Sequence, residues 1–266
     1  MSKFKEHYEE LWYWYLTGDH RGGFSREFER DLARIRRVFG VFPGRPRCLE
    51  CDRPMHGLGG RLANCRPASY SPKLCNDCEQ AMRAEEGGAE VGLTLLFADV
   101  RGSTTLAEHT STAEYKQLIQ RFYQTAGEVL IRHDALVNRL MGDQVIGLFV
   151  PRFAGEAHSQ AAVTAALALL RATGHADPAG PWVPVGAGIH TGSAYVGAVG
   201  ASGGVNEIAV LGSAANLAAR LASQAATGEV LVSEAAAAGA KLTGGERREL
   251  TLKGISEPVG VRVVKI

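Results

Sequence analysis

The most informative absence in this sequence of 266 residues is that of cysteine after position 78, which leaves 188 residues without a thiol. Thiolate metal sites and disulfides are therefore excluded from that part of the chain. Apolar runs of transmembrane length and an N-terminal signal-peptide core are also lacking. The net charge is only +1, so whole-chain charge gives no argument for a nucleic acid or an anionic membrane as partner. We expect a cytoplasmic protein.

What the sequence does contain is the composition of an ordinary folded protein, with 45% hydrophobic and 21% charged residues. Its length fits one or two domains. Two glutamates followed by two glycines at positions 85–88 resemble a joint, and the pattern of apolar residues changes just beyond it. We therefore expect a helical N-terminal region at residues 1–88 and a second domain at residues 89–266.

The N-terminal region combines a helical pattern with a cluster of cysteines. Apolar residues recur every three or four positions over residues 1–42, and Gly22-Gly23 interrupts them, which predicts two helices. Four of the five cysteines form two CxxC pairs, namely Cys48, Cys51, Cys75 and Cys78. Paired CxxC turns typically hold a structural zinc ion. Two disulfides or unrelated thiols are the alternative, which a reducing cytoplasm disfavours. Cys65 is left over as a spectator.

The order of elements after residue 90 predicts an α+β fold. Strands are expected at 91–100, 135–141 and 145–150, and helices at 103–133, with Ser103 or Thr104 as N-cap, and at 156–172. A hairpin around Thr191-Gly192 is expected between strands 183–190 and 194–199. A helix at 213–224 and short strands near 230, 250 and 262 follow. The order β-α-β-β-α-β is a split βαβ, ferredoxin-like arrangement.

Two aspartates stand out within this pattern. Asp99 ends the first strand, and Asp143 lies in the turn of the hairpin after Gly142. If these strands pair, the two carboxylates meet at one end of the sheet. Two carboxylates held together attract hard divalent cations, and a pair of such cations suits chemistry on phosphate.

Four motifs in order then resemble the class III nucleotidyl cyclases. They are the run from Phe97 to Thr104, the pair Gly142-Asp143, the run from Gly188 to Gly192, and the run from Leu211 to Leu221 that contains Asn216 and Arg220. The resemblance covers about residue 91 to the C-terminus. It implies that the 3′-oxygen of a nucleoside triphosphate attacks its own α-phosphate, with release of pyrophosphate. The motif around Gly188 is expected to build the dimer scaffold.

The resemblance also implies roles for residues. Asp99, Asp143 and the backbone carbonyl of Val100 would hold two divalent ions, Mn or Mg. Asn216 would orient the ribose, and Arg220 would stabilise charge on the α-phosphate. A lysine near the phosphates has Lys253 as its nearest candidate. In such enzymes each site forms between two chains, so a homodimer is expected.

The residues that would read the base depart from the adenine-selective pattern. Arg139 and Ala209 stand where those members have a Lys and an Asp or Thr, and Phe97 could lie against a base or ribose. Arg139 offers only donors, which suit the carbonyl oxygens of uracil or guanine. The pairs of guanine-selective members are absent. The sequence thus looks most like the uridylate cyclases of bacterial anti-phage Pycsar systems, whose cyclic product activates a separate effector protein.

Three alternatives remain beside conversion of UTP to cUMP. One is an adenylate cyclase with a relaxed base pocket, and another is a catalytically silent cyclase-like binding module. The third is a zinc-dependent nucleic-acid binder led by residues 43–80, a segment made basic by Arg45, Arg47, Arg53, Arg61 and Arg66. Because this segment has no recognition helix or strongly basic face, a zinc-pinned packing or dimerisation element is favoured over nucleic-acid binding.

Overall fold

The computed structural model describes residues 2–69, 71–84, 87–199 and 207–266. The chain divides into two compact units, Met1–Val91 with Tyr195–Val210, and Gly92–Ala194 with Leu211–Ile266. The division at residue 88 made from the sequence stays a prediction, since the first unit also takes in a later segment. Among the described residues, no helix is both long enough and apolar enough to cross a bilayer.

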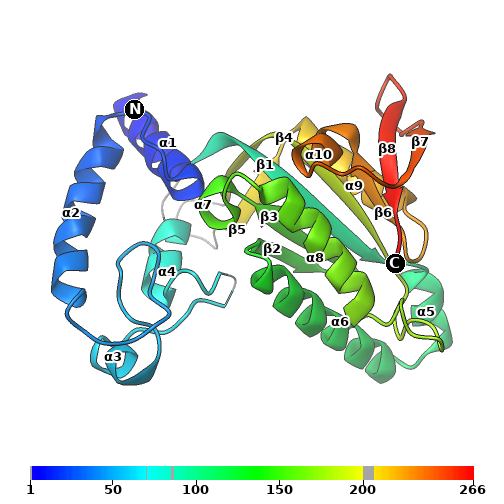
Figure 1. Ribbon diagram of the computed structural model, residues 1–266, viewed down its shortest axis with the longest axis horizontal. Coiled ribbons are helices and arrows are strands. Elements are labelled where there is room, and N and C mark those ends of the chain that lie inside the picture. The colour runs from blue at the N-terminus through cyan, green and yellow to red at the C-terminus, as the bar shows by residue number, and fades with distance from the viewer. Residues whose placement is uncertain (1, 70, 85–86, 200–206) are drawn as a thin grey trace. The chain divides into compact units, whose positions relative to one another are not determined.

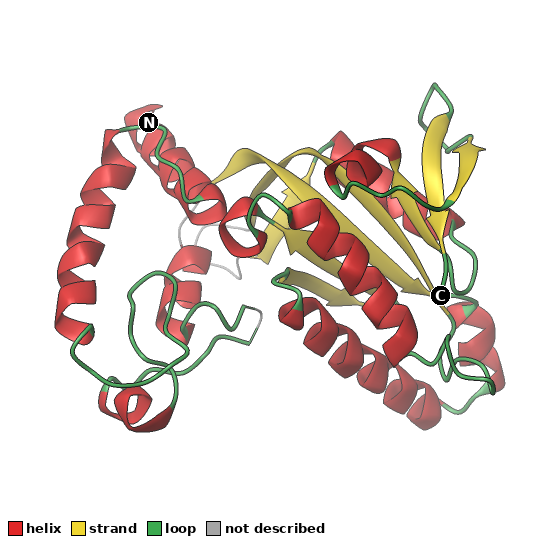
Figure 2. Ribbon diagram, in the orientation of Figure 1, coloured by secondary structure: helices red, strands yellow, loops and turns green. Residues whose placement is uncertain are grey.

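The first unit begins with helices and loops (Figure 2). Its helices are α1 (Ser2–Thr17), α2 (Gly23–Phe39), α3 (Gly57–Leu62) and α4 (Asn76–Ala84). The predicted interruption near Gly22-Gly23 is confirmed, because α1 ends at Thr17 and α2 begins at Gly23. Trp12 and Trp14 of α1 are fully buried and form the aromatic centre of this unit. The same unit contains the end of β4 (Val185–Val199) and nearly all of β5 (Glu207–Leu211), which pair with each other.

The second unit is built on the sheet, whose strand order is β2-β3-β1-β4-β6-β8-β7 (Figure 1). Its strands are β1 (Gly87–Val100) from Gly92 onward, β2 (Leu136–Met141), β3 (Gln144–Phe149), β4 as far as Ala194, β6 (Val230–Ser233), β7 (Glu246–Leu250) and β8 (Val259–Val264). The first four strands along the chain take the order β2-β3-β1-β4, which is that of a ferredoxin-like sheet. The predicted α+β fold is therefore confirmed.

Helices cover one face of this sheet, where α6 (Thr112–Arg132) and α8 (His158–Ala172) lie side by side (Figure 1). Leu96, Ala98 and Val100 alternate along β1 and pack in the same core cluster as Phe122 of α6 and Leu169 of α8. The shorter helices are α5 (Ser103–His109), α7 (Pro151–Ala154) and α10 (Glu234–Gly239). This core holds the ends of β1 and β3 in place.

A smaller core cluster lies beneath α9 (Ser213–Gln224), which follows Gly212 as the sequence predicts. Leu221 of α9 packs there with Leu231 of β6 and Val261 of β8. Strand β6 pairs in parallel with β4 and antiparallel with β8. The C-terminal strands thus form the support on which α9 rests.

Two of the predicted elements were wrong. The hairpin around Thr191-Gly192 does not form, because β4 runs on without a turn and the Thr191 hydroxyl bonds to Thr94 and Ser159 inside the protein. The single helix over residues 103–133 is two helices, and the second starts at a capping box formed by Ser111 and Glu114. Residues 85–86 of the expected joint lie outside the described residues, and β1 begins at Gly87.

Candidate functional site

The two aspartates lie next to each other where β1 ends and β3 begins, as the expected pairing of these strands predicts. Asp99 pairs with Gln144 in the antiparallel register of the two strands. The amide of the following residue, Val100, donates to the carbonyl oxygen of Asp143 at 3.0 Å. Gly142 forms the turn before Asp143 with a φ of 63°, and its carbonyl accepts a hydrogen bond from the Tyr123 hydroxyl at 2.7 Å.

Both carboxylates are held by hydrogen bonds from neighbouring side chains. Asp99 Oδ1 accepts from Gln144 Nε2 at 2.7 Å, and its Oδ2 accepts from Arg101 Nη2 at 2.8 Å. The hydroxyl of Ser103 donates to Asp143 Oδ2. Ser103 is therefore not the N-cap, which is Gly102 with a φ of 67°. Sequence reasoning missed Arg101 and Gln144, although each lies within two positions of a selected aspartate.

The electrostatics at this strand end fit a cation. Burial raises the pKa of Asp99, and the nearby charge of Asp143 raises it further, while Gln144 and Arg101 act in the opposite direction. The charge of Asp143 opposes ionisation of the buried Asp99 carboxyl, and bound divalent ions would relieve that repulsion. Each aspartate also retains lone pairs beyond those used by its protein donors. The donor set therefore suits hard divalent ions, although the ligand role of these residues stays a prediction.

Asn216 and Arg220 share the exposed face of α9. Ala214, Ala218 and Leu221 are buried beneath the helix, while Asn216 and Arg220 are exposed. Within the described part of the chain, neither side chain forms a hydrogen bond or ion pair with either aspartate. The structure thus groups the aspartates together and leaves this second pair facing solvent in a single copy.

A glycine of β4 sets the position of α9. A Cβ atom on Gly188 would lie 2.2 Å from the amide nitrogen of Ala222 and 2.6 Å from the carbonyl oxygen of Ala218. The strand and the helix therefore touch through their backbones. This is the physical reason for a glycine in the motif from Gly188 to Gly192, whose expected role in a dimer scaffold stays a prediction.

The remaining candidate residues are scattered over several elements. Phe97 is buried in β1, and Arg139 lies in β2 beside a register shift, opposite Ile146. Ala209 is half-buried in β5 of the first unit, and Lys253 is exposed in the turn after Leu252. Their proposed contacts with a base or phosphates stay predictions.

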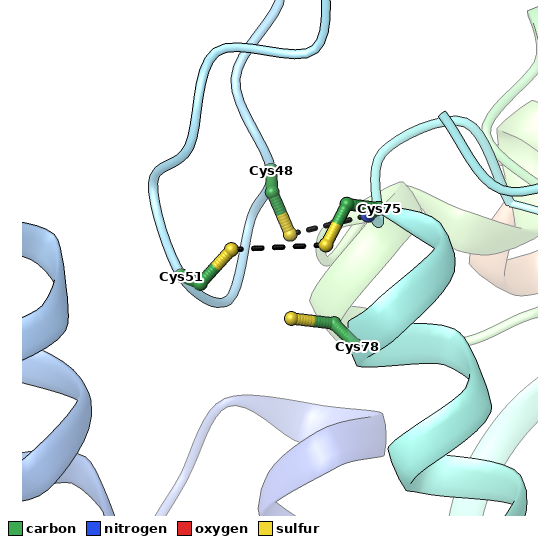
Figure 3. Close-up of side chains that lie close together, drawn as sticks. All are labelled: Cys48, Cys51, Cys75 and Cys78. Atoms are coloured by element: carbon green, nitrogen blue, oxygen red, sulfur yellow. Dashed lines mark hydrogen bonds between the residues drawn. The ribbon is translucent and has the colours of Figure 1, made fainter. Parts of the chain in front are cut away.

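The four paired cysteines come together in the first unit (Figure 3). All four sulfur atoms lie within 4.8 Å of one another, and Cys51 Sγ is 3.7 Å from Cys75 Sγ. The amide of Cys75 donates to Cys48 Sγ at 3.2 Å, and no disulfide links these residues. Cys78 is presented by the first turn of α4. Four convergent thiols from two CxxC turns match the donor set of a structural zinc site.

The thiols perturb one another, and their mutual hydrogen bonds raise the pKa of Cys48 and Cys78. Hydrogen bonds from Cys48, Cys51 and Cys78 lower the pKa of Cys75, and a hydrogen bond from Cys48 lowers that of Cys51. Arg53, which bonds to Asp77 at 2.7 Å, places its positive charge near these two sulfurs. Cys65 lies outside the set of four, and burial raises its pKa to about 12.

Comparisons with known proteins point to one family. A family model described as the adenylate and guanylate cyclase catalytic domain matches residues 89–261. Adenylate cyclase 1 of Rhizobium meliloti (strain 1021) is 30% identical over 176 residues, and an adenylate cyclase of Mycobacterium bovis is 30% identical over 173 residues. These alignments cover 62% and 64% of this chain but only 26% and 38% of the two relatives. The chain thus spans well under half the length of these relatives.

Solved structures share the fold. The guanylyl cyclase Cya2 has a TM-score of 0.61 at 23% identity, with 66% of this chain and 93% of that chain covered. The adenylyl cyclase CyaB from P. aeruginosa has a TM-score of 0.59 at 26% identity, with 67% and 96% covered. Both likenesses span almost the whole of the compared cyclase chains and about two thirds of this one.

Proposed function

The chain belongs to the family of adenylate and guanylate cyclase catalytic domains, and from this premise we propose that it converts a nucleoside triphosphate to the 3′,5′-cyclic nucleotide and pyrophosphate. The observation that carries the proposal is the pair Asp99 and Asp143, brought together where β1 ends and β3 begins. A pair of carboxylates at that place is the donor set that such a reaction needs for two divalent ions.

The chemistry divides between ions and side chains. Asp99, Asp143 and the carbonyl of Val100 would hold Mn or Mg ions, which when bound supply Lewis acidity to the attacking 3′-oxygen and to the triphosphate. Gln144, Arg101 and Ser103 hold the two carboxylates in place by hydrogen bonds. Asn216 orients the ribose. Arg220 donates to the oxygens of the α-phosphate, where negative charge builds up during attack.

The catalytic site is shared between two copies of the chain. One protomer supplies the aspartates and its partner supplies the α9 face. The support for this is the exposure of Asn216 and Arg220, which lack side-chain partners among the described residues of their own chain. A two-fold symmetric homodimer would then contain two equivalent sites.

UTP is the favoured substrate, and cUMP the favoured product. The support is the pair Arg139 and Ala209, which stand in place of lysine and of a residue with a carboxylate or hydroxyl. Alanine at position 209 removes the acceptor that adenine N6 needs. Production of cUMP in the cytoplasm would serve as a second messenger in anti-phage defence, read by a separate effector protein. The predicted base contacts of Phe97 and phosphate contact of Lys253 belong to this proposal.

Adenylate cyclase activity is the second candidate. Its support is that two relatives at 30% identity carry the name adenylate cyclase, and that arginine keeps the positive charge of the expected lysine. A silent binding module is disfavoured, because both aspartates, Asn216 and Arg220 are all present.

A structural zinc ion in the four-cysteine cluster completes the proposal. A site with four thiolate ligands has no open coordination position, so the ion would stabilise the first unit and take no part in catalysis. The convergence of Cys48, Cys51, Cys75 and Cys78 supports it.

One assay tests the proposed function. The purified dimer is incubated separately with ATP, GTP, CTP and UTP in the presence of Mn or Mg, and the products are identified by mass spectrometry. We expect cUMP to dominate. Dominant cyclic AMP would overturn the uridylate proposal and leave the cyclase intact, whereas no cyclic product from any nucleotide, beside an active control cyclase, would overturn the enzyme.

A further inference from the structure

Arg101 connects the two parts of the proposed machinery within one chain. It is the first residue after β1, and its Nη2 donates to Asp99 Oδ2 at 2.8 Å. Its Nη1 donates to the carbonyl oxygen of Ser223 at 3.1 Å and to that of Ala225 at 3.5 Å. These two carbonyls belong to the C-terminal end of α9. One guanidinium group therefore contacts both a predicted metal ligand and the helix that carries Asn216 and Arg220.

The geometry of Arg101 suits a fixed connection. Its side chain is 22% exposed, and its backbone amide donates to the carbonyl oxygen of Pro184, just before β4, at 2.8 Å. The Ser223 hydroxyl in turn donates to the carbonyl oxygen of Arg220 at 2.8 Å, which extends the contacts one turn along α9. A guanidinium group offers its donors in a rigid plane, and the carbonyl end of a helix attracts positive charge.

We propose that Arg101 is a positioning residue that couples the two half-sites of each protomer. The inference rests on the proposed function, in which a protomer gives its aspartates to one site of the dimer and its α9 to the other. Arg101 orients the Asp99 carboxylate for the first site. Through Ser223 and Ala225 it also fixes the end of the helix that presents Arg220 to the second site.

Metal binding tests the first half of this role. Manganese binding to Arg101→Ala is measured directly by electron paramagnetic resonance, without turnover. We expect binding about tenfold weaker than in the unchanged chain, the usual size of an effect on a residue that orients a metal ligand. Arg132→Ala is the matched control, since Arg132 is exposed and, among the residues that the structure describes, pairs only with Glu128 on the same helix. Equal manganese affinity in both variants would overturn the orienting role.

A heterodimer with one intact catalytic site tests the second half of this role, the positioning of α9. The first protomer carries Arg220→Ala and the second carries Asp99→Ala, so the only intact site combines Asp99 of the first with Arg220 of the second. Arg101→Ala is then introduced into one protomer at a time. In the first protomer it removes the hydrogen bond to the Asp99 carboxylate of the intact site. In the second it can act only through α9, because Asp99 is already absent there.

The two placements give different expected results. In the first protomer, we expect weaker metal binding. In the second, we expect kcat to fall about tenfold while manganese affinity and KM stay unchanged. Arg101→Lys in the second protomer is a milder variant, because lysine keeps the positive charge but lacks the planar guanidinium group. The same fall in kcat is expected, and a folded Arg101→Lys chain would show that the fall is not due to unfolding.

An unchanged kcat in the second placement would overturn the coupling and leave the cyclase proposal standing. Inactivity of the heterodimer before any change at Arg101, with both chains folded and paired, would overturn the shared site and the coupling together.

Discussion

Substitution of Gly188 by alanine should disable the enzyme by moving α9 as a whole. The added Cβ would lie 2.2 Å from Ala222 N, 2.6 Å from Ala218 O and 2.7 Å from Leu221 C, which are all backbone atoms of α9. Backbone atoms cannot rotate away as a side chain can. Restoring ordinary contact, which starts at 3.4 Å, requires the helix and the strand to separate by about 1 Å.

That displacement has two measurable consequences. Forcing a methyl group into a packed interface costs about 1–3 kcal/mol of stability. Moving Asn216 and Arg220 by about 1 Å from their working positions should lower kcat by about 100-fold. Because Asp99 lies near the end of β1 and Asp143 in the turn before β3, the affinity for manganese should change much less than kcat. Steady-state cyclase assays and thermal unfolding followed by circular dichroism measure the two effects.

Gly92→Ala is the matched control for this experiment. Gly92 also lies in a strand, β1, but a Cβ atom there would meet nothing within 4 Å. We expect its kcat to stay within about twofold of the unchanged chain, since only local strand preference is altered. If Gly188→Ala kept the kcat of the control, the placement of α9 against β4 as the basis of activity would be refuted.

Further predictions concern stability and the cysteine cluster. Burial raises the pKa of Glu229, but hydrogen bonds led by those from Arg248 lower it overall to about 2. The ionised Glu229 therefore contributes its full stabilisation above about pH 4.5 and loses it as the pH falls toward 2. Melting temperatures measured over that pH range should fall less in Glu229→Gln than in the unchanged chain. Elemental analysis of the freshly purified chain should find one zinc ion per chain. Cys75→Ser should remove the ion and lower the melting temperature. A native chain free of metal would exclude the zinc site. Ser111→Ala removes the N-cap that accepts from the amide of Glu114, so chemical denaturation should show a loss of about 0.5–2 kcal/mol, and an unchanged free energy of unfolding would refute the role of this cap.

The sequence predicted the placement of the aspartates well because the signal is local at both ends. Asp99 lies near the end of the apolar strand β1, and Asp143 follows a glycine in the turn between β2 and β3. Antiparallel pairing of β1 with β3 is therefore enough to bring the two aspartates together. The four cysteines were predictable for a similar reason, since each CxxC pair forms its own turn. In both cases a local strand end or turn places each residue, and pairing of two such segments, 45 positions apart for Asp99 and Gln144 and 24 apart for Cys51 and Cys75, brings the groups together.

What the sequence did not reveal depends on contacts between distant segments. Thr191-Gly192 has the composition of a turn, yet Thr191 lies inside β4 because its hydroxyl finds partners in Thr94 and Ser159. Arg101 gave no signal of its own, because its partners Ser223 and Ala225 lie more than 120 positions away. Ser103 was expected to cap a helix, and the structure instead turns its hydroxyl to Asp143. Tertiary partners thus overrode local preference at each of these positions.

Complementation between inactive chains is the most direct test of a metal-dependent cyclase site shared by two copies. Asp99→Ala and Arg220→Ala are each expected to be inactive alone. Mixed in equal amounts under conditions of subunit exchange, half of the dimers would be mixed and each would contain one intact site, so about a quarter of the original activity should return. Recovery near that value would bear out the account. No recovery, with mixed dimers demonstrated by mass spectrometry, would contradict it.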